Sequence, residues 1–296
     1  MAAIDVRYRR GPDERVELLR SIPFLLIHVL PFAAIWTGVK PRDVILCAAL
    51  YVVRMFFITA GYHRYFGHRA YKLGRVMQFV MALGGTTAAQ KGVLWWAGHH
   101  RHHHKHSDTP KDIHSPRRGF WWAHVGWILC SKYDETPTAS IKDFAKYPEL
   151  VWLDRYHLLP PIALGVGVYL WGGWSALFIG FFLSTALLYH GTFVINSLTH
   201  RWGTRRFRTT DTSRNSFLLA LITLGEGWHN NHHHYQSTAN QGFFWWEIDV
   251  SYYALKILSW VGLAHDLRTP PKHVLESDLI VDGEPDTGML MPPPAE

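Results

Sequence analysis

Histidine is concentrated in one short stretch of this sequence. The eleven residues Gly98–Asp108 include six of the 20 histidines in the 296-residue chain. Neutral imidazole is the commonest side-chain metal ligand in proteins, so the stretch indicates a metal site. A surface tract that binds metal loosely is one alternative, and a purification tag is another, although tags stand at chain ends.

The spacing of the histidines separates candidate ligands from their neighbours. His100, His103 and His104 stand at positions i, i+3 and i+4, which share one face of a helix. A second triplet with the same spacing begins 129 residues later, and a loose tract has no reason to repeat its phase. That triplet is His229, His232 and His233. Four histidines out of phase with the triplets are expected around the site or at the surface: His99, His102, His106 and His234.

Three more histidines follow apolar segments. His63 and His68 are five residues apart, so on a regular helix their rings diverge by about 140°. They can reach one metal only if the helix ends or distorts between them. His200 ends a later apolar run, one turn after Asn196. Nine candidate histidines exceed the needs of one tetrahedral ion, and such nitrogen-rich sites suit zinc, copper, nickel or iron, so we predict two metals.

The composition favours a protein that is partly embedded in a membrane. Hydrophobic residues make up 48% of the chain and charged residues 18%, below the roughly 25% of soluble domains. The net charge of +7 is compatible with nucleic-acid binding. The basic residues flank apolar segments, however, so we expect a membrane and no nucleic acid as the partner. Cys47 and Cys130 are too few for a disulfide framework and are expected to be structural.

Four apolar runs have the length of membrane crossings. They cover residues 22–38, 44–62, 156–171 and 174–195. The first two lie near the lower end of the roughly 17–25 residues that span a bilayer as a helix. A polar link at 40–43 joins the first pair and Gly172-Gly173 joins the second, so both pairs are expected to form antiparallel hairpins. For the first pair, two buried helices of a soluble protein are the alternative.

The distribution of Lys and Arg predicts the orientation. The N-terminal segment, residues 63–150 and the residues after 200 hold nearly all basic side chains, which places these parts and both termini in the cytoplasm. The predicted fold class is an all-α membrane protein, with four transmembrane helices and a cytoplasmic helical cap carrying a histidine-rich di-metal site. The predicted division is an N-terminal segment 1–20, a hairpin 21–62, cap residues 63–152, a hairpin 153–195, cap residues 196–276 and a disordered tail 277–296.

Five motifs occur in a fixed order along residues 45–268. They are His63-Arg64-Tyr65-Phe66-Gly67-His68-Arg69, His100-Arg101-His102-His103-His104-Lys105, Asn196-Ser197-Leu198-Thr199-His200, Gly225-Glu226-Gly227-Trp228-His229-Asn230-Asn231-His232-His233 and Trp245-Trp246-Glu247-Ile248-Asp249. Together they resemble the integral-membrane fatty acyl desaturases, in particular the stearoyl-CoA delta-9 group. The first, second and fourth resemble the three histidine boxes of that family, and the third resembles the segment after its fourth span.

The resemblance implies two iron ions and O2 as a co-substrate. The implied ligands are His63, His68, His100, His103, His104, His200, His229, His232 and His233, with Asn196 binding one metal through a water molecule. The implied reaction removes two hydrogens from a saturated acyl chain and inserts a cis double bond, expected at the delta-9 position. Breaking an unactivated C–H bond needs a metal–oxygen oxidant, so no catalytic residue is expected beyond the metal centre.

The electrons for this reaction are expected to come from a separate protein. The chain contains no His-Pro-Gly-Gly segment of a fused cytochrome b5. We therefore expect a ferredoxin, a rubredoxin or a cytochrome b5, each with its reductase, as the donor. The resemblance and the charge pattern together predict a multi-pass protein of a bacterial inner membrane, with its metal site on the cytoplasmic side.

The resemblance also assigns residues to the substrate. Four are expected at the bend of an acyl tunnel, two near its closed end and one on the coenzyme A phosphates: Gln90, Trp96, Thr192 and Phe193, then Tyr51 and Met55, then Lys132. For the first six, ordinary apolar packing is the alternative. Four further basic residues could add charge for the carrier or contact lipid headgroups: Arg64, Arg69, Arg117 and Arg118.

The carrier of the acyl chain is less constrained by the motifs. Gly98-His99 stands where animal members of the family have an Arg-Asp pair that contacts coenzyme A. Lys132 matches a basic residue used on the phosphates, so an acyl-CoA is expected. Acyl carrier protein and membrane lipid stay open as carriers.

Two other functions are compatible with parts of the sequence. An alkyl or acyl hydroxylase with histidine boxes would share the metals, the spans and O2, although related hydroxylases space their boxes differently. A protein that transports or stores metal would place ionisable residues near the middle of its spans. Only His28, Arg54 and His190 interrupt the apolar runs, so transport is disfavoured.

Overall fold

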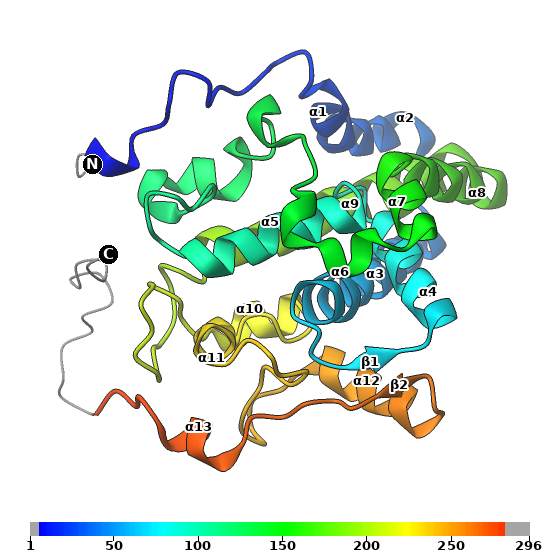
Figure 1. Ribbon diagram of the computed structural model, residues 1–296. Coiled ribbons are helices and arrows are strands. Elements are labelled where there is room, and N and C mark those ends of the chain that lie inside the picture. The colour runs from blue at the N-terminus through cyan, green and yellow to red at the C-terminus, as the bar shows by residue number, and fades with distance from the viewer. Residues whose placement is uncertain (1–5, 282–296) are drawn as a thin grey trace.

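Helices form nearly all of the regular structure in residues 6–281, which are the residues that this computed structural model describes (Figure 1). The α-helices are α1 Ile22–Val29, α2 Ala34–Thr37, α3 Pro41–Phe56, α4 Arg75–Thr86, α5 Val93–His106, α6 Lys142–Ala145, α7 Pro148–Arg155, α8 Leu159–Ser175, α9 Ser184–Ser197, α10 Phe217–Ile222, α11 His229–His234, α12 Val250–Trp260 and α13 Lys272–Glu276. The 3₁₀ turns are Val6–Tyr8, Leu30–Ala33, Pro116–Arg118, Ser131–Tyr133 and Thr138–Ser140. Three segments are π-helical: Phe57–Gly67, Trp122–Gly126 and Ala176–Leu183. The short strands β1 Lys72–Leu73 and β2 Ala264–His265 pair antiparallel.

Two helical segments are long and apolar enough to cross a bilayer. α3 continues through the first π-helical segment to give Pro41–Gly67, and α8 continues into α9 to give Leu159–Ser197. The second segment is interrupted at Gly173, whose φ of +71° and ψ of −161° break the helix at the predicted glycine turn. Ile22–Thr37 is apolar but shorter than a full span. A mostly helical fold is therefore confirmed, and four crossings remain a prediction.

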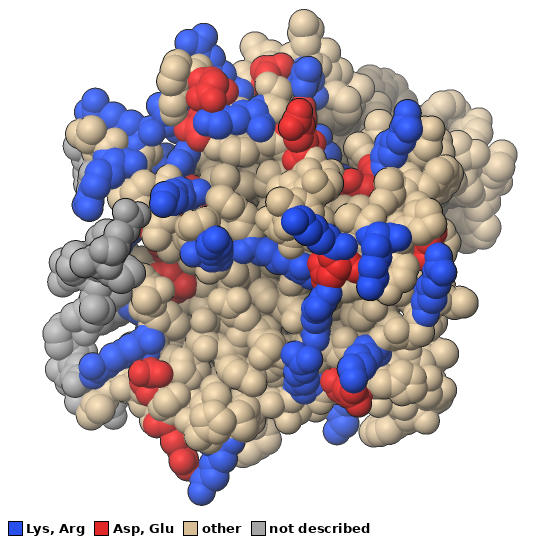
Figure 2. Space-filling model, in the orientation of Figure 1, with Lys and Arg blue, Asp and Glu red and all other residues tan. Residues whose placement is uncertain are grey.

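Exposed apolar side chains lie along the helices predicted as spans. Phe32, Trp36, Ile45, Ile162 and Leu170 are each more than half exposed, and Trp36 reaches 84%. Such surfaces are costly in water and cost nothing against lipid tails. Figure 2 shows the same molecule as a space-filling view, and no Lys or Arg side chains are visible at its right-hand edge where α8 lies in Figure 1. The pattern favours membrane helices over the buried helices of a soluble protein.

Arg54 is the one basic residue inside the predicted second span, and the fold satisfies it internally. Its side chain is 1% exposed. The guanidinium donates to the Leu50 carbonyl at 3.0 Å, to Thr185 Oγ1 at 2.8 Å and to Ser184 Oγ at 2.5 Å. A buried cation in a membrane helix requires such acceptors. Arg54 therefore ties α3 to the beginning of α9.

One apolar core joins the long helices to the cap. Phe66, Leu150, Leu153, Leu188 and Leu255 are fully buried in it. They come from the first π-helical segment, from α7, from α9 and from α12, so elements distant in sequence share the same core. This packing fixes the end of the π-helical segment beside α5 and α11. Those three elements and the loop after α9 carry the predicted metal ligands.

Both ends of the described chain pack against the cap. Tyr8 donates to the Asp108 carbonyl at 2.9 Å, and Glu14 pairs with Arg118 at 2.8 Å, so the N-terminal segment lies against the cap. At the other end, Leu279 forms an isolated antiparallel bridge with Phe207. The rest of the predicted tail, residues 282–296, lies outside the described residues.

Candidate metal centre

The π-helical geometry of Phe57–Gly67 brings His63 and His68 together. The His68 amide donates to the His63 carbonyl at 3.1 Å, a bond between residues five apart. Residues with that spacing share a face of a π-helix, whereas they diverge on an α-helix. Their ring centroids lie 4.9 Å apart. The distortion that the spacing required is present in the structure.

The nine predicted histidines gather in two clusters, within each of which the candidate ligand atoms lie within 4.8 Å of one another. The five-histidine cluster consists of His63, His68, His100, His104 and His232. The four-histidine cluster consists of His103, His200, His229 and His233. α5 gives positions i and i+4 of its triplet to the first cluster and i+3 to the second, and α11 does the reverse. Each triplet thus contributes to both clusters.

The Nε2 atoms of the five-histidine cluster point at one another. His63 Nε2 lies 3.0 Å from His232 Nε2, and His232 Nε2 lies 3.0 Å from His104 Nε2. His68 Nε2 lies 2.7 Å from His100 Nε2. Several ring nitrogens cannot all share protons at these distances. A cation among them would accept all of their lone pairs, so the donor set fits a metal ion.

All four residues of the second cluster are buried. His200 Nε2 lies 3.1 Å from His229 Nε2, and the His229 and His233 rings are 4.3 Å apart between centroids. His233 Nε2 is buried and has no hydrogen-bond partner in the described residues. An unpartnered buried nitrogen aimed at other imidazoles also fits an ion at this point.

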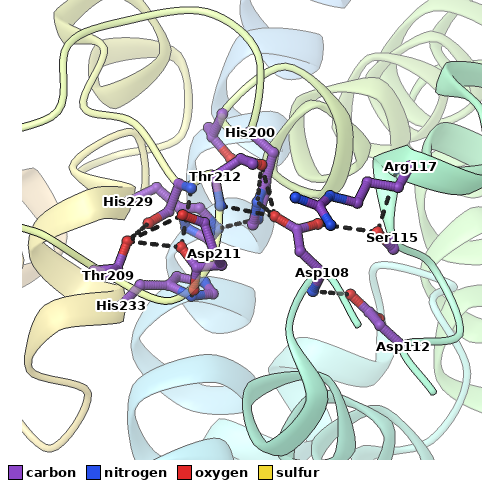
Figure 3. A network of polar contacts seen from close by, with 12 residues as sticks. Asp108, Asp112, Ser115, Arg117, His200, Thr209, Asp211, Thr212, His229 and His233 are labelled. Atoms are coloured by element: carbon purple, nitrogen blue, oxygen red, sulfur yellow. Dashed lines mark hydrogen bonds and ion pairs between the residues drawn. The ribbon is translucent and has the colours of Figure 1, made fainter. Parts of the chain in front are cut away.

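Carboxylates hold several of the histidines by their other ring nitrogen (Figure 3). His200 Nδ1 lies 3.1 Å from Asp108 Oδ2, and His233 Nδ1 lies 2.5 Å from Asp211 Oδ2. The other two contacts are His103 Nδ1 with Asp112 Oδ2 at 3.1 Å and His63 Nδ1 with Glu226 Oε2 at 2.5 Å. A carboxylate at Nδ1 keeps the proton on that nitrogen and leaves Nε2 free for a metal.

The environment keeps most of these imidazoles neutral at neutral pH. Burial, followed by repulsion from neighbouring histidines, lowers the pKa of His68, His100 and His104 well below the ordinary value of 6.5. The same causes lower the pKa of His229 and His232. Because a metal binds neutral imidazole, these shifts favour metal binding.

A cavity of about 380 Å³ adjoins both clusters. His63 and His100 of the five-histidine cluster line it, as do His103 and His229 of the four-histidine cluster, and so does Asn196. Apolar residues from several elements form much of the remaining wall: Pro23, Phe24, Ile27, Met55, Ile58, Trp95, Trp96, Trp127, Ile128, Leu129, Leu158, Phe193 and Ile195. A cavity whose accessible wall is mostly apolar suits a long apolar substrate.

A family model described as fatty acid desaturase matches residues 43–267. This chain belongs to the fatty acid desaturase family. It is 36% identical over 267 residues to the sn-2 palmitoyl-lipid 9-desaturase of Nostoc sp., which covers 88% of this chain and 94% of that protein. The sn-1 stearoyl-lipid 9-desaturase of Synechocystis sp. is 39% identical over 222 residues, 73% of this chain and 68% of that protein. The acyl-CoA C20 Delta5-desaturase of Anemone leveillei is 37% identical over 231 residues, 76% and 73% of the two chains.

These similarities confirm the resemblance drawn from the motifs. The delta-9 desaturases among the relatives match this chain over most of its length. The desaturase is therefore an oxidoreductase that acts on fatty acids, and its histidine clusters indicate metal binding.

Five of the seven residues assigned to the substrate line the cavity of the desaturase. They are Gln90, Trp96, Thr192, Phe193 and Met55. Trp96 stacks on the metal-site residue His100, with centroids 4.9 Å apart. Gln90 Nε2 donates to Thr192 Oγ1 at 2.9 Å. Trp96 of the expected bend thus lies beside the five-histidine cluster, and the other three residues of the bend line the same cavity.

The other two assigned residues do not line the cavity. Tyr51 donates its hydroxyl to the Ile222 carbonyl at 2.8 Å and lies behind Met55. Lys132 pairs with Asp13 at 2.9 Å and with Glu14 at 3.5 Å. Its ammonium is therefore engaged with carboxylates of the N-terminal segment.

The four out-of-phase histidines are in neither cluster. His99 is buried against Trp95 and lines the cavity. His102 packs against His106 near the surface. His234 stacks on Phe207, with centroids 4.0 Å apart, and contacts the Val274 carbonyl. The six histidines of the two triplets thus lie in the clusters, and the four out-of-phase histidines do not.

Sequence reasoning missed the carboxylates behind the histidines. Glu226 lies inside the fourth motif and Asp108 ends the histidine-rich stretch Gly98–Asp108, but neither was predicted to have a role, and Asp112 and Asp211 lie in loops without a motif. A single Asp in a polar loop carries no spacing signal. His114 was also missed, although it is buried, lines the cavity and stacks on His103 with centroids 4.3 Å apart.

Proposed function

We propose that this desaturase inserts a cis delta-9 double bond into a saturated acyl chain carried by a membrane lipid. O2 would be the oxidant, and a separate protein would supply the electrons. The continuity of one mostly apolar cavity with two histidine clusters carries the proposal. Two relatives named as lipid 9-desaturases support the position and the carrier. Another relative is named as an acyl-CoA Delta5-desaturase, so the position of the double bond and the carrier both need an experimental test.

Two iron ions are the metals that this proposal requires. The five-histidine cluster would hold one, the four-histidine cluster the other, and Asn196 would bind a water molecule beside them. All nine ligands are imidazoles, a donor set that suits iron as well as zinc or copper, and an oxidation by O2 favours iron. Iron would supply the oxidising power for removing two hydrogens from the acyl chain, and these two hydrogens, O2, two electrons and two protons together would give two waters.

The residues of the cavity would hold and bend the acyl chain. Gln90 and Thr192 are hydrogen-bonded to each other, so an apolar chain can pass them without leaving a buried polar group unpaired. Trp96 lies flat against His100, which keeps that side of the passage apolar. Met55 is fully buried, and with Tyr51 behind it would close the far end and limit chain length.

The surroundings of Gly98 argue against a coenzyme A carrier bound in the animal manner. A Cβ at residue 98 would lie 2.7 Å from Pro137 Cγ, so an arginine does not fit there without movement. His99 is 9% exposed and faces the cavity. With Lys132 paired to Asp13, neither the Arg-Asp position nor the matching lysine offers an unengaged cation for phosphate.

The position of α1 supports a carrier that stays in the membrane. Pro23, Phe24 and Ile27 of α1 line the cavity, while Leu25 and Leu26 on the same helix are about half exposed. α1 would thus separate the cavity from lipid by one helix. Arg20, which also lines the cavity, pairs with Asp134 at 2.6 Å at the beginning of this helix. The apolar side chains of α1, rather than an unengaged cation, therefore support a carrier that stays in the membrane.

The membrane topology that we propose is the one predicted from the sequence. Four spans, with both termini and the two clusters in the cytoplasm of a bacterium, would place the metals where a soluble electron donor can reach them. A ferredoxin, a rubredoxin or a cytochrome b5 would serve as that donor.

A reconstituted assay tests the carrier and the reaction together. The iron-loaded desaturase in lipid vesicles, with a ferredoxin and its reductase, is given either stearoyl-labelled phospholipid or stearoyl-CoA, with lipid remodelling absent. We expect a delta-9 double bond in the phospholipid and at least about tenfold less product from stearoyl-CoA. Preferential turnover of stearoyl-CoA would contradict the lipid carrier, and a hydroxy acid as main product would identify a hydroxylase. The His103→Ala variant is the inactive control.

A further inference from the structure

Three carboxylates stand behind the four-histidine cluster. Asp108, Asp112 and Asp211 each contact the Nδ1 atom of a different histidine of that cluster. Figure 3 shows Asp108 with His200 and Asp211 with His233. Each of the three is at most 4% exposed. Within this cluster, the fourth histidine, His229, is the one whose buried Nδ1 has no hydrogen-bond partner in the described residues.

Hydrogen bonds from the loops hold these carboxylates in place. Asp108 Oδ2 accepts from the Thr212 amide at 2.8 Å and from Thr212 Oγ1 at 2.6 Å. Asp112 Oδ2 accepts from the Asp108 amide at 3.0 Å. Asp211 Oδ1 accepts from the Ser213 amide at 3.0 Å. All these donors are neutral, so they orient the carboxylates without cancelling their charge.

Histidines are the ion-pair partners of these three carboxylates within residues 6–281. Asp108 pairs with His200, Asp211 with His233, and Asp112 with His103. The second contact of Asp112, at 3.9 Å, is also with a histidine. With neutral imidazoles, about three negative charges therefore lie behind four ligands in a buried region, where charges interact strongly.

The five-histidine cluster has a different environment. Its one carboxylate contact is Glu226, at His63. Arg64 donates to Glu226 at 2.9 Å and pairs with Asp249 at the same distance, so a buried cation offsets the charge behind this cluster. The Nδ1 atoms of His104 and His232 are buried and have no partner in the described part of the chain. The negative charge is thus concentrated at the other cluster.

We propose that Asp108, Asp112 and Asp211 are positioning residues that make the four-histidine cluster the stronger cation site, so that it binds its metal more tightly than the five-histidine cluster. A carboxylate at Nδ1 raises the basicity of the imidazole and fixes its orientation, and its charge stabilises the ion. The number of ligands alone predicts the reverse order, because the other cluster offers one more nitrogen. This inference rests on the two-metal site of the proposed function.

Graded removal of metal tests the order of affinities. The iron-loaded, reduced desaturase is equilibrated without O2 against increasing concentrations of a competing chelator, and iron per chain is measured by elemental analysis. We expect two steps, and anomalous scattering from crystals of the half-loaded protein should show iron at the four-histidine cluster. Iron retained at the five-histidine cluster, or loss of both ions in one step, would overturn the proposal. This readout needs no turnover, so it is independent of which substrate the enzyme oxidises.

Charge variants test the role of the carboxylates. Asp211→Asn keeps an acceptor for His233 Nδ1 and removes the charge, so the tighter step should weaken by about 10- to 100-fold. Asp211→Glu, which keeps the charge, should restore most of the affinity. Glu226→Gln is the matched control and should change the weaker step alone. Equal effects of Asp211→Asn and Asp211→Glu would mean that shape, and not charge, determines the affinity.

A reduction potential separates an electrostatic role from a structural one. Removing a negative charge disfavours the ferric state, so the potential of the iron at the four-histidine cluster should rise in Asp211→Asn. The potential of the other iron should stay near its parent value. If Asp211→Asn does not fold, Asp112→Asn provides the same comparison through His103. Unchanged potentials at both ions in a folded variant would overturn the electrostatic assignment.

Discussion

Adjacent histidines in the second box have different surroundings, and this difference predicts their roles. His103 is 3% exposed and belongs to the four-histidine cluster. The His102 ring lies outward against His106 and contacts the Lys111 carbonyl. His103→Ala should lower desaturation at least about 100-fold, since even the partners behind a ligand contribute 10- to 100-fold to affinity. His102→Ala should stay within about twofold of the parent.

The two variants are compared by measuring the double bonds in the lipids of an expressing host and the iron content of the purified proteins. Western blotting of the membrane fraction controls for expression. Equal losses of activity in His102→Ala and His103→Ala would refute the assignment by phase.

The protonation of the buried histidines predicts acid lability of the metal-free protein. Burial, then neighbouring histidines, depresses the pKa of His68, His100 and His104, while the unfolded chain titrates near 6.5. Below pH 6.5 the unfolded state therefore binds more protons than the folded state, so the stability of the folded protein falls as the pH is lowered. The pKa of His200 shifts in the opposite direction, because the negative charge of Asp108 outweighs the effect of burial and raises it.

Among the nine cluster histidines, six have a lowered pKa and His200 has a raised pKa, which sets the expected direction. The melting temperature of the metal-free protein in detergent should fall between pH 7.5 and 5.5. Differential scanning fluorimetry measures it. A melting temperature that stays constant or rises as the pH is lowered from 7.5 to 5.5 would contradict neutral, buried imidazoles.

At the scale of elements, the contact between α3 and α9 depends on a buried cation. Arg54 is bound by Ser184 and Thr185, so removing both hydroxyls in Ser184→Ala/Thr185→Val leaves charged donors unpaired. We expect a loss of roughly 1.5–3 kcal/mol per hydrogen bond to the charged group. Arg54→Met, which leaves no buried charge, should cost less. Unfolding in detergent compares the two, and a larger loss in Arg54→Met would contradict this reading.

The proposed function predicts that Met55, near the end of α3, limits the length of the acyl chain. Met55 is fully buried, lines the cavity and lies next to Gly191, since a Cβ at residue 191 would be 2.8 Å from Met55 Cε. Met55→Trp should fill the far end and shift the products from C18 towards C16 or shorter chains. Met55→Val, which is smaller, is the control and should keep C18 chains. Gas chromatography of product methyl esters measures this, and an unchanged profile in Met55→Trp would place the closed end elsewhere.

Sequence patterns predicted the elements better than their relative placement. The apolar runs, the glycine turn at Gly173 and the phase of the histidine triplets are local signals, and each has its counterpart in the structure. The division of each triplet between two clusters depends on how α11 packs across α5, which no local pattern contains. The π-helical segment was required by the spacing of His63 and His68, but its hydrogen-bond pattern was not readable from it.

At the scale of the molecule, the cap and the long helices form one body around the cavity. The same core contains Phe66 beside the metal site, Leu188 of α9 and Leu255 of α12. The carboxylates behind the histidines come from loops that only this packing brings together, so no local sequence pattern indicates them. The contact of Gly98 with Pro137 and the pairing of Lys132, on which the proposed carrier is argued, were likewise not predictable, because both arise from packing between distant segments.

Lipid analysis of a host that expresses this chain tests the central claim most directly. A bacterium that makes no delta-9 unsaturated fatty acid aerobically is transformed with the parent chain or with His103→Ala, and the double bonds are located by mass spectrometry. We predict delta-9 monounsaturated C16 or C18 chains in the membrane lipids of cells with the parent chain only, and only under O2. Saturated lipids alone, in cells whose membranes contain the iron-loaded protein and a competent electron donor, or hydroxy acids in their place, would contradict the account.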